Sequence, residues 1–340
     1  MTQVTQVTKV TRVNFALIGA GRIGRIHAGN IARHPRARLA YVADADAKAA
    51  ASLAQQFGAQ TIGLDCAVTG GDVDAVLIAS STDTHADWIE RCAASRKPVL
   101  CEKPLDLDAQ RAATCVRTAR EAGILLYLGF NRRYDPSFMR LKREIVAGTI
   151  GALETLHIIS RDPSPPPVEY IKRSGGLFRD MMIHDLDMAR WLLAAEPVEV
   201  FARGSALADP AIGTAGDVDT AMVMLRTASG QLCQIANSRR CSFGYDQRIE
   251  AFGSKGMVRA DNHTATSVTV AGNNGFNTEP AVPFFLERYA DAYRLELDDF
   301  INALDKQRVE LATGDDGWRA LLLADAAQRS LTTGAPVALK

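Results

Sequence analysis

Short apolar runs recur through the first 130 residues, and a segment with the apolar spacing of a helix follows most of them. The runs are VNFALI (13–18), ARLAYVA (37–43), DAVLIAS (74–80), KPVLC (97–101) and ILLYLGF (124–130). Buried strands that alternate with helices are typical of a parallel, doubly wound sheet. We therefore expect an α/β fold whose first domain covers residues 1–129.

The pattern changes after Gly129 to strands separated by turns, without a helix between each pair. These strands are ALETLHIIS (152–160), DTAMVMLRT (219–227), GQLCQIANSRR (230–240), QRIEAFGS (247–254), GMVRAD (256–261) and ATSVTVAG (265–272). Two amphipathic helices are expected near the end, at 287–304 and 315–331. The second domain, residues 130–340, is thus predicted to be α+β with a large, mostly antiparallel open sheet.

The first apolar run leads into a glycine motif, GAGRIG, in which Gly19, Gly21 and Gly24 enclose Arg22 and Ile23. In a Rossmann domain such glycines let the backbone approach the pyrophosphate of a dinucleotide, which lies at the helix N-terminus. The motif alone is weak, but its position between a strand and a helix supports it.

The choice between NAD and NADP depends on the end of the second strand. Asp44 lies 20 residues after Gly24, where an acidic residue binds the adenosine ribose. Its carboxylate would repel a 2′-phosphate, and Ala45 offers no cation to hold one. We therefore expect NAD as the cofactor, while Lys48, one turn further, leaves NADP open.

Polar residues follow three of the predicted parallel strands. They are Ser80-Ser81, Glu102-Lys103-Pro104 and Asn131-Arg132-Arg133. Ligands of open α/β sheets bind at these strand ends. Lys103 is either a solvated loop lysine or a functional group, and its position in a nucleotide-binding sheet favours the second; Pro104 allows a cis bond before it.

The stretch GGLFRDMMIHDLDMARWL (175–192) has the apolar spacing of one helix. Asp180 and His184 would then lie one turn apart on the same face, with Asp187 continuing the polar stripe. Large apolar residues flank this stripe closely. Asp180 and His184 are therefore either structural residues or part of the wall of an active site. Metal binding by the two side chains is a less favoured interpretation.

GAGRIG, CEKPL, GFNRRYD and the 175–192 stretch, in that order, resemble the glucose–fructose oxidoreductase/inositol dehydrogenase/MocA family, and within it the bacterial inositol dehydrogenases. The resemblance extends over nearly the whole chain from Val13. It implies that Lys103, Asp180 and His184 are catalytic, with His184 as the acid–base. The residues implied to bind the cofactor, besides the glycine motif and Asp44, are Ser80, Ser81, His85, Glu102 and Lys103. Lys103, Asn131, Arg132, Asp180 and His184 are implied to contact the substrate, although Asn131 stands where some relatives have Met.

With this resemblance, the stripe is read as an active-site wall. The function expected is NAD-dependent oxidation of a cyclic polyol, myo-inositol to 2-keto-myo-inositol (scyllo-inosose), with His184 as general base. One alternative is a related NAD(P)-dependent dehydrogenase that acts on a pyranose or on scyllo-inositol. A non-catalytic dinucleotide-sensing regulator is the other. The family also implies a homo-oligomer, a tetramer or a dimer.

Composition and charge exclude several other classes. Lys and Arg (39) balance Asp and Glu (39) and are scattered, which is unlike a nucleic-acid-binding protein. No apolar run approaches the roughly 20 residues that span a bilayer, and the opening segment lacks the apolar region of a secretory signal. Six separated cysteines without a C-x-x-C pair indicate reduced thiols and a cytoplasmic protein. His and Cys lack metal-ligand spacing, so no metal is expected.

The Pro-rich segment 163–167 is either a rim of the pocket or a spacer.

Overall fold

The computed structural model describes residues 12–305 and 312–339. Their contacts group them into two compact units. The first unit takes residues 12–106, 110–129, 293–305 and 312–314, and the second takes 107–109, 130–292 and 315–339. The division of the sequence after residue 129 stays a prediction, because the units are spatial groups that also include short segments from elsewhere in the chain. Residues 1–11, to which most of the opening segment belongs, lie outside the described residues.

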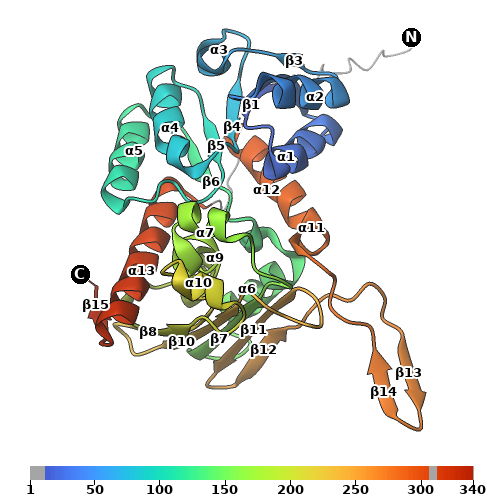
Figure 1. Ribbon diagram of the computed structural model, residues 1–340, viewed down its shortest axis with the longest axis vertical. Helices are drawn as coiled ribbons and strands as arrows, with labels where there is room; N and C mark the ends of the chain where they lie inside the picture. Colours follow the sequence, from blue (N-terminus) through green and yellow to red (C-terminus); the bar gives the residue numbers. More distant parts are fainter. Residues whose placement is uncertain (1–11, 306–311, 340) are drawn as a thin grey trace, which may run out of the picture. The chain divides into compact units, whose positions relative to one another are not determined.

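The first unit is built on a parallel sheet of six strands in the order β3-β2-β1-β4-β5-β6 (Figure 1). The strands are β1 Val13–Ile18, β2 Ala37–Ala43, β3 Gln60–Thr61, β4 Ala75–Ile78, β5 Val99–Cys101 and β6 Leu126–Leu128. The winding changes direction between β1 and β4, and in such sheets the ligand crevice lies at the carboxyl ends of these strands. The predicted doubly wound parallel sheet is confirmed.

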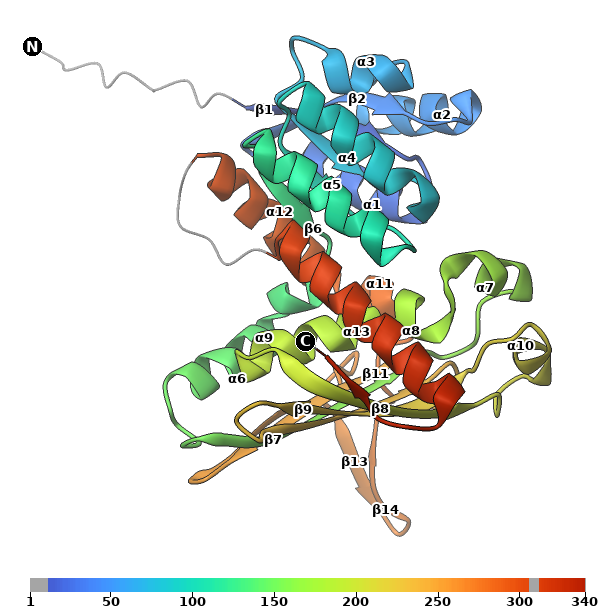
Figure 2. The same cartoon turned by 90° about the vertical axis from the view of Figure 1, so that its left-hand side faces the viewer.

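Helices cover both faces of this sheet (Figures 1 and 2). They are α1 Arg22–Arg33, α2 Ala47–Phe57, α3 Leu64–Thr69, η1 Thr82–Thr84, α4 His85–Ala94, α5 Ala109–Glu121 and α12 Ala290–Leu304. Three buried residues of α12, Leu297, Phe300 and Ile301, pack in one cluster with Phe15 and Ile31. The late helix α12 therefore completes the core of the first unit.

The second unit is built on a seven-stranded sheet in the order β12-β11-β7-β10-β9-β8-β15. Its strands are β7 Leu153–Arg161, β8 Pro197–Ser205, β9 Thr220–Thr227, β10 Leu232–Ser238, β11 Asp246–Gly253, β12 Gly256–Ala260 and β15 Val337–Ala338. Among these neighbours only β7 and β10 run parallel. The predicted mostly antiparallel sheet is confirmed, and the parallel pair places the carboxyl ends of β7 and β10 together.

Helices of the second unit lie on one face of this sheet (Figure 2). They are η2 Asn131–Tyr134, α6 Pro136–Val146, α7 Val168–Ser174, α8 Gly176–Asp180, α9 Ile183–Leu193, α10 Pro210–Thr214, α11 Phe285–Arg288 and α13 Gly314–Thr333. No helix in the described part of the chain covers the opposite face. Along β9, buried and exposed residues alternate, so Met222 and Met224 point outward.

One strand prediction was wrong in its pairing. The segment 265–272 was expected in the large sheet, but its strand β13 Thr269–Gly272 pairs only with β14 Gly275–Thr278. All residues of these two strands are exposed. An alternating polar and apolar pattern indicates a strand but does not identify its neighbour.

Candidate active site

The glycine loop packs so closely that two of its three glycines have no room for a side chain. A Cβ at Gly19, which has φ +107°, would lie 2.3 Å from the carbonyl oxygen of Ala79. A Cβ at Gly24 would lie 2.0 Å from the carbonyl oxygen of Gly19. A Cβ at Gly21, by contrast, has no atom within 4 Å. Gly19 and Gly24 thus serve the packing of strand against helix, and Gly21 borders open space.

That open space lies at the N-terminus of α1. Gly21 is the N-cap, and neither a capping side chain nor an acidic residue occupies the first turn. Arg22 is exposed and Ile23 half-buried at the start of the helix. Uncapped N–H groups at a helix N-terminus are suited to a phosphate. The loop therefore fits the pyrophosphate of a dinucleotide.

Asp44 lies against this loop. Its Oδ2 accepts a hydrogen bond from the backbone N–H of Ala20 at 2.6 Å, and its Oδ1 accepts one from Asp46 N–H at 2.8 Å. The carboxylate is half-buried beside the glycines, whereas Ala45 and Lys48 are exposed. This is the position from which an acidic residue reaches the ribose of NAD.

The loop after β4 is fixed by His85. The ring Nδ1 lies 2.7 Å from the carbonyl oxygen of Pro104, and Nε2 lies 3.1 Å from that of Ser80. Burial lowers the pKa of His85, so the imidazole is neutral and donates one hydrogen bond. Ser80 contacts Thr84 through their hydroxyls at 2.7 Å, and Ser81 is exposed. His85 connects the Ser80 loop to Pro104; its contact with NAD stays a prediction.

The Glu102-Lys103-Pro104 segment follows β5, and the peptide bond between Lys103 and Pro104 is cis. Glu102 is 8% exposed, and its Oε1 lies 2.7 Å from His27 Nε2 of α1. Lys103 is half-buried. The glycine loop, Asp44, the Ser80 loop and this segment all belong to the first unit, as expected for a cofactor site.

The stretch 175–192 forms two helices, so the expectation of one continuous helix was wrong. Helix α8 ends at Asp180 and α9 begins at Ile183. Met181 and Met182 between them keep right-handed dihedral angles (φ −98° and −69°). The chain thus turns without leaving the helical region, which is why the apolar spacing continues across the break.

Asp180 and His184 lie on either side of this break. Asp180 Oδ1 accepts a hydrogen bond from the Tyr170 hydroxyl at 2.9 Å, and Oδ2 accepts one from Arg239 Nη2 at 3.3 Å. His184 is half-buried, and its ring meets the ring of Phe130 edge-on at 5.9 Å. In the second unit, hydrogen bonds thus hold the Asp180 carboxylate, and an aromatic contact holds the His184 imidazole.

Asp162 and Arg239 were not identified from the sequence. Each follows one strand of the parallel pair β7 and β10, and Asp162 N–H donates to the carbonyl of Ser238 at 2.9 Å. Burial raises the pKa of Asp162 to about 6, and the charges of Asp180 and Asp185 add to the rise against Arg239 and Arg132. Groups that titrate near neutral pH are frequent in active sites. Their signal in the sequence was a charged residue near the end of each predicted strand.

The Pro-rich segment runs from Asp162 to α7. Pro167 has φ −56° and ψ 143°, close to polyproline II. The segment thus begins directly after Asp162, and the helix at its other end carries Tyr170, which donates to Asp180. These contacts favour the rim over the spacer, and that role stays a prediction.

Arg132 is buried in an ion pair. Its Nη1 donates to Asp185 Oδ1 at 2.5 Å and to Ser160 Oγ at 2.9 Å, and Asn237 Nδ2 donates to Asp185 Oδ2 at 2.9 Å. Arg132 is 4% exposed and Asn131 2%. Both belong to η2, but the charge of Arg132 is already balanced, so their expected contact with substrate stays a prediction.

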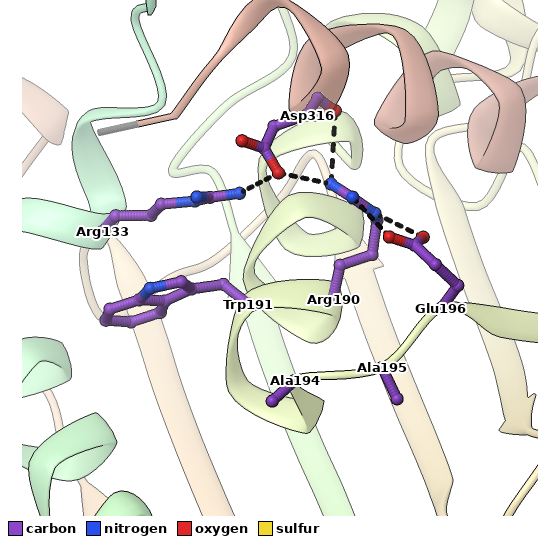
Figure 3. Close-up of a pocket in the computed structure, with 7 residues that line it drawn as sticks. All are labelled: Arg133, Arg190, Trp191, Ala194, Ala195, Glu196 and Asp316. Carbon is purple, nitrogen blue, oxygen red and sulfur yellow. Dashed lines mark hydrogen bonds and ion pairs between the residues drawn. The ribbon is translucent and has the colours of Figure 1, made fainter. Parts of the chain in front are cut away.

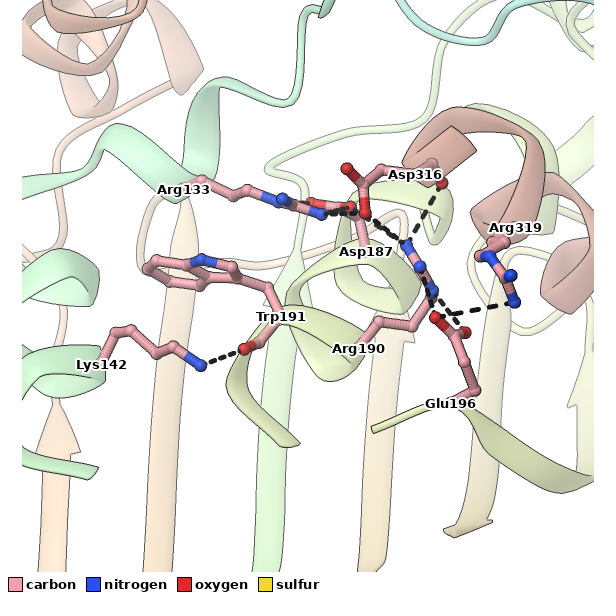
Figure 4. Close-up of polar contacts among 8 residues, drawn as sticks. All are labelled: Arg133, Lys142, Asp187, Arg190, Trp191, Glu196, Asp316 and Arg319. Atoms are coloured by element: carbon pink, nitrogen blue, oxygen red, sulfur yellow. Dashed lines mark hydrogen bonds and ion pairs between the residues drawn. The ribbon is translucent and has the colours of Figure 1, made fainter. Parts of the chain in front are cut away.

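Asp187 does not continue the polar stripe, which corrects that expectation. Its carboxylate is buried and accepts two hydrogen bonds from Arg133, at 2.8 Å from Nε and 2.5 Å from Nη2 (Figure 4). Asp316 of α13 lies 3.1 Å from Arg133 Nη2 and 3.1 Å from Arg190 Nη1. Spacing along α9 could not reveal this, because the partner lies 54 residues away in the sequence.

A cavity of about 440 Å³ opens beside this network (Figure 3). It is lined by Arg133, Arg190, Trp191, Ala194, Ala195, Glu196 and Asp316. Arg190 holds Glu196 with hydrogen bonds at 2.8 and 2.6 Å, so the charged groups neutralise one another. Of these residues, only Arg133 was expected at a strand end where ligands bind, and the network ties α9 to α13.

Two further properties bear on the class of site. Among residues 12–305 and 312–339, no group of three or more His, Cys, Asp or Glu side chains is arranged to hold a metal ion. None of the described helices is long and apolar enough to cross a membrane.

Comparison with known proteins identifies the family. A family model described as "Oxidoreductase family, NAD-binding Rossmann fold" matches residues 13–130, and the "GFO/IDH/MocA C-terminal domain" matches residues 138–259. A Rhizobium meliloti protein named "Inositol 2-dehydrogenase" is 50% identical over 94% of this chain and 97% of its own. "Myo-inositol 2-dehydrogenase" of Thermotoga maritima is 45% identical over 94% of this chain and 96% of its own.

Solved structures agree with this likeness. A myo-inositol dehydrogenase from Corynebacterium glutamicum has a TM-score of 0.92 at 44% identity, covering 97% of this chain and 99% of that one. A scyllo-inositol dehydrogenase from Lactobacillus casei, solved with NAD(H) and scyllo-inositol, has a TM-score of 0.89 at 30% identity, covering 96% and 99%.

Proposed function

The chain belongs to the Gfo/Idh/MocA family of oxidoreductases with an NAD-binding Rossmann domain, and from this membership we propose that it oxidises myo-inositol to scyllo-inosose with NAD⁺. The proposed substrate rests on the similarity, over nearly the whole chain, to proteins named inositol 2-dehydrogenase. The open space before α1 and the carboxylate of Asp44 beside it support NAD as the cofactor.

Oxidation of a secondary alcohol needs an acceptor for hydride and a base for the hydroxyl proton. NAD⁺ supplies the acceptor. His184 is assigned as the base, because imidazole, whose reference pKa in model peptides is about 6.5, is suited to proton exchange around neutral pH. Phe130 meets the ring edge-on, which restricts its orientation.

Asp180 and Lys103 are assigned to the charges that develop during the reaction. The Asp180 carboxylate orients the imidazole or a substrate hydroxyl and stabilises the imidazolium. Tyr170 and Arg239 fix the position of this carboxylate. Lys103 donates to the reacting oxygen, where alkoxide character develops. These roles follow from the family motifs that the three residues occupy.

The decisive experiment is turnover of NAD⁺ by the purified protein with myo-inositol, scyllo-inositol and a set of pyranoses. Preferred reduction of NAD⁺ with myo-inositol is the expected result. Higher catalytic efficiency with scyllo-inositol or a pyranose would assign that compound as the substrate in place of myo-inositol. Binding of NADH without turnover of any polyol would indicate a regulator.

The assembly proposed is a homo-oligomer, a tetramer or a dimer, in the cytoplasm. The helix-free face of the large sheet exposes Met222, Met224, Phe252 and Met257 at 45–51%. Exposed apolar patches of this kind indicate contact surfaces between proteins. Light scattering on the full chain tests the assembly, and a monomer would refute it. The six free cysteines fit a reducing compartment.

A further inference from the structure

A carboxyl group without a hydrogen-bond partner is buried in the first unit. Glu296 of α12 is 1% exposed, and among the described residues neither of its carboxylate oxygens has a partner. Buried polar groups are nearly always hydrogen-bonded, so an exception needs an explanation. The proposed reaction does not use Glu296.

The groups that surround Glu296 come from three elements. His27 of α1 binds Glu102 at the end of β5 (2.7 Å), and the His27 ring meets the ring of Tyr293 edge-on at 5.6 Å. Tyr293 lies one helical turn before Glu296 on α12, so their side chains share a face. Burial and then the negative charge of Glu102 raise the pKa of Glu296. Glu296 therefore belongs to one buried cluster with His27 and Glu102.

This environment disfavours a negative charge on Glu296. An ionised carboxylate without donors is costly in a buried position, and a second negative charge nearby increases the cost. Burial and the charge of Glu102 accordingly raise the pKa of Glu296 well above its ordinary value. Glu102, in contrast, has His27 as a partner for its charge.

Glu102 has little room to move away from a second charge. A Cβ at Gly129, at the end of β6, would lie only 2.9 Å from Glu102 Oε2. Its other oxygen, Oε1, contacts His27 Nε2 at 2.7 Å. Repulsion from an ionised Glu296 would therefore displace the backbone of Glu102 and, with it, the next residue, Lys103.

We propose that Glu296 is a positioning residue for the Glu102-Lys103-Pro104 segment, a neutral carboxyl that lets Glu102 keep the single negative charge of the cluster. This inference rests on the proposed function only in that the segment serves NAD and the reacting alcohol. Positioning of the segment requires the proton on Glu296 and does not require a negative charge at this residue.

The first test is the pH dependence of stability in the full chain. Because the pKa of Glu296 is raised by folding, its stabilisation is complete below the unfolded pKa and is lost as the pH rises. Relative to Glu296→Gln, the folding equilibrium constant of the wild type should fall about tenfold per pH unit from about pH 4.3 upward, until the raised pKa is reached. If the ratio of the two folding equilibrium constants does not change with pH, the proposal that folded Glu296 is protonated is refuted.

The second test is NADH affinity, measured by fluorescence titration over the same pH range. At neutral pH, Glu296→Gln should bind NADH within about twofold of the wild type. In alkaline solution the wild type should lose affinity relative to the variant, since only its residue 296 can ionise. Parallel pH profiles would overturn the positioning role, and a tenfold loss in Glu296→Gln at neutral pH would show that the charge itself is required.

Two further variants complete the design. Glu296→Leu, neutral and similar in size, is a second reference: relative to it, the folding equilibrium constant of the wild type should fall with pH in the same way, which covers the case that Gln does not fold. Asp298→Asn makes the same chemical change two residues along α12, where the carboxylate pairs with His34 at 2.8 Å; its NADH profile should follow the wild type. Neither test uses a polyol, so failure of the proposed substrate leaves both readouts intact.

Discussion

The glycine loop allows cofactor binding and folding to be perturbed separately, by Gly21→Ala and Gly24→Ala. Gly21 has φ −72° and ψ −164°, a backbone that alanine adopts freely, and its added methyl meets no atom within 4 Å. Stability should therefore hold or rise by up to about 1 kcal/mol, because alanine restricts the unfolded chain. The methyl would nevertheless stand where the backbone has to approach a pyrophosphate. Losing one hydrogen bond to a charged group costs about 1.5–3 kcal/mol, so NADH binding should weaken about 10- to 100-fold.

Gly24→Ala should show the opposite pattern. Its methyl would lie 2.0 Å from the carbonyl oxygen of Gly19, so loop and helix must separate by about 1.4 Å to reach ordinary contact. Overpacking of this kind costs about 1–3 kcal/mol, which corresponds to about 2–12 °C in a unit of this size. NADH affinity should fall as well, because the loop itself is displaced.

Thermal unfolding and NADH fluorescence titration of the three proteins test this pair. Gly21→Ala should unfold at or slightly above the wild-type temperature and bind NADH poorly, whereas Gly24→Ala should unfold at a lower temperature. Wild-type NADH affinity in Gly21→Ala would refute the placement of the pyrophosphate. A wild-type unfolding temperature in Gly24→Ala would refute the close approach of Gly19.

Four further predictions concern the cofactor and the two units. The wild type should prefer NAD⁺ over NADP⁺ about tenfold or more in kcat/KM, and Asp44→Ala should reduce this preference because the carboxylate that repels the 2′-phosphate is gone. Equal kcat/KM of the wild type with both cofactors would contradict this prediction. Lys103→Ala should lower kcat by about 10²–10³ and still bind NADH; near-normal turnover would remove its role. His184→Ala should lower kcat by about 10²–10⁴ and lose the acidic limb of the kcat/KM profile; an intact limb would make the residue structural. Asp162, whose pKa burial raises to about 6, contributes stability that is complete below about pH 4 and lost as the pH rises through 6. In urea unfolding, the wild type should therefore lose stability relative to Asp162→Asn over that range and no further above it; a constant difference would contradict the shift.

Features that depend on neighbours in the sequence could be predicted. The run from β1 through Gly19 and Gly24 into α1 is local, and the carboxylate of Asp44 lies at the glycine loop as its spacing indicated. The outward positions of Met222 and Met224 follow from alternation along β9. In each case the physical rule acts over a few residues.

Features that depend on distant pairing could not be predicted. Asp162 and Arg239 lie close together because β7 runs parallel to β10, and no spacing within either segment shows this pairing. The break after Asp180 was missed for another reason, since Met181 and Met182 keep helical dihedral angles. The role of α12 in the first unit depends on contacts with Phe15 and Ile31, far earlier in the chain.

The two arginines of η2 explain why a change at His184 should leave the fold intact. Arg132 binds Asp185 and Arg133 binds Asp187, so two buried ion pairs fix α9 against η2. Removing one partner of a buried pair leaves an uncompensated charge, which costs about 3–5 kcal/mol. His184 precedes Asp185 directly, but its ring packs against Phe130 and carries no part of either pair. The position of the imidazole is therefore set by its neighbours, whereas its own removal leaves both pairs in place. A large loss of turnover in His184→Ala with unchanged stability would thus be a chemical effect, and a matching loss of stability would assign the residue to the core.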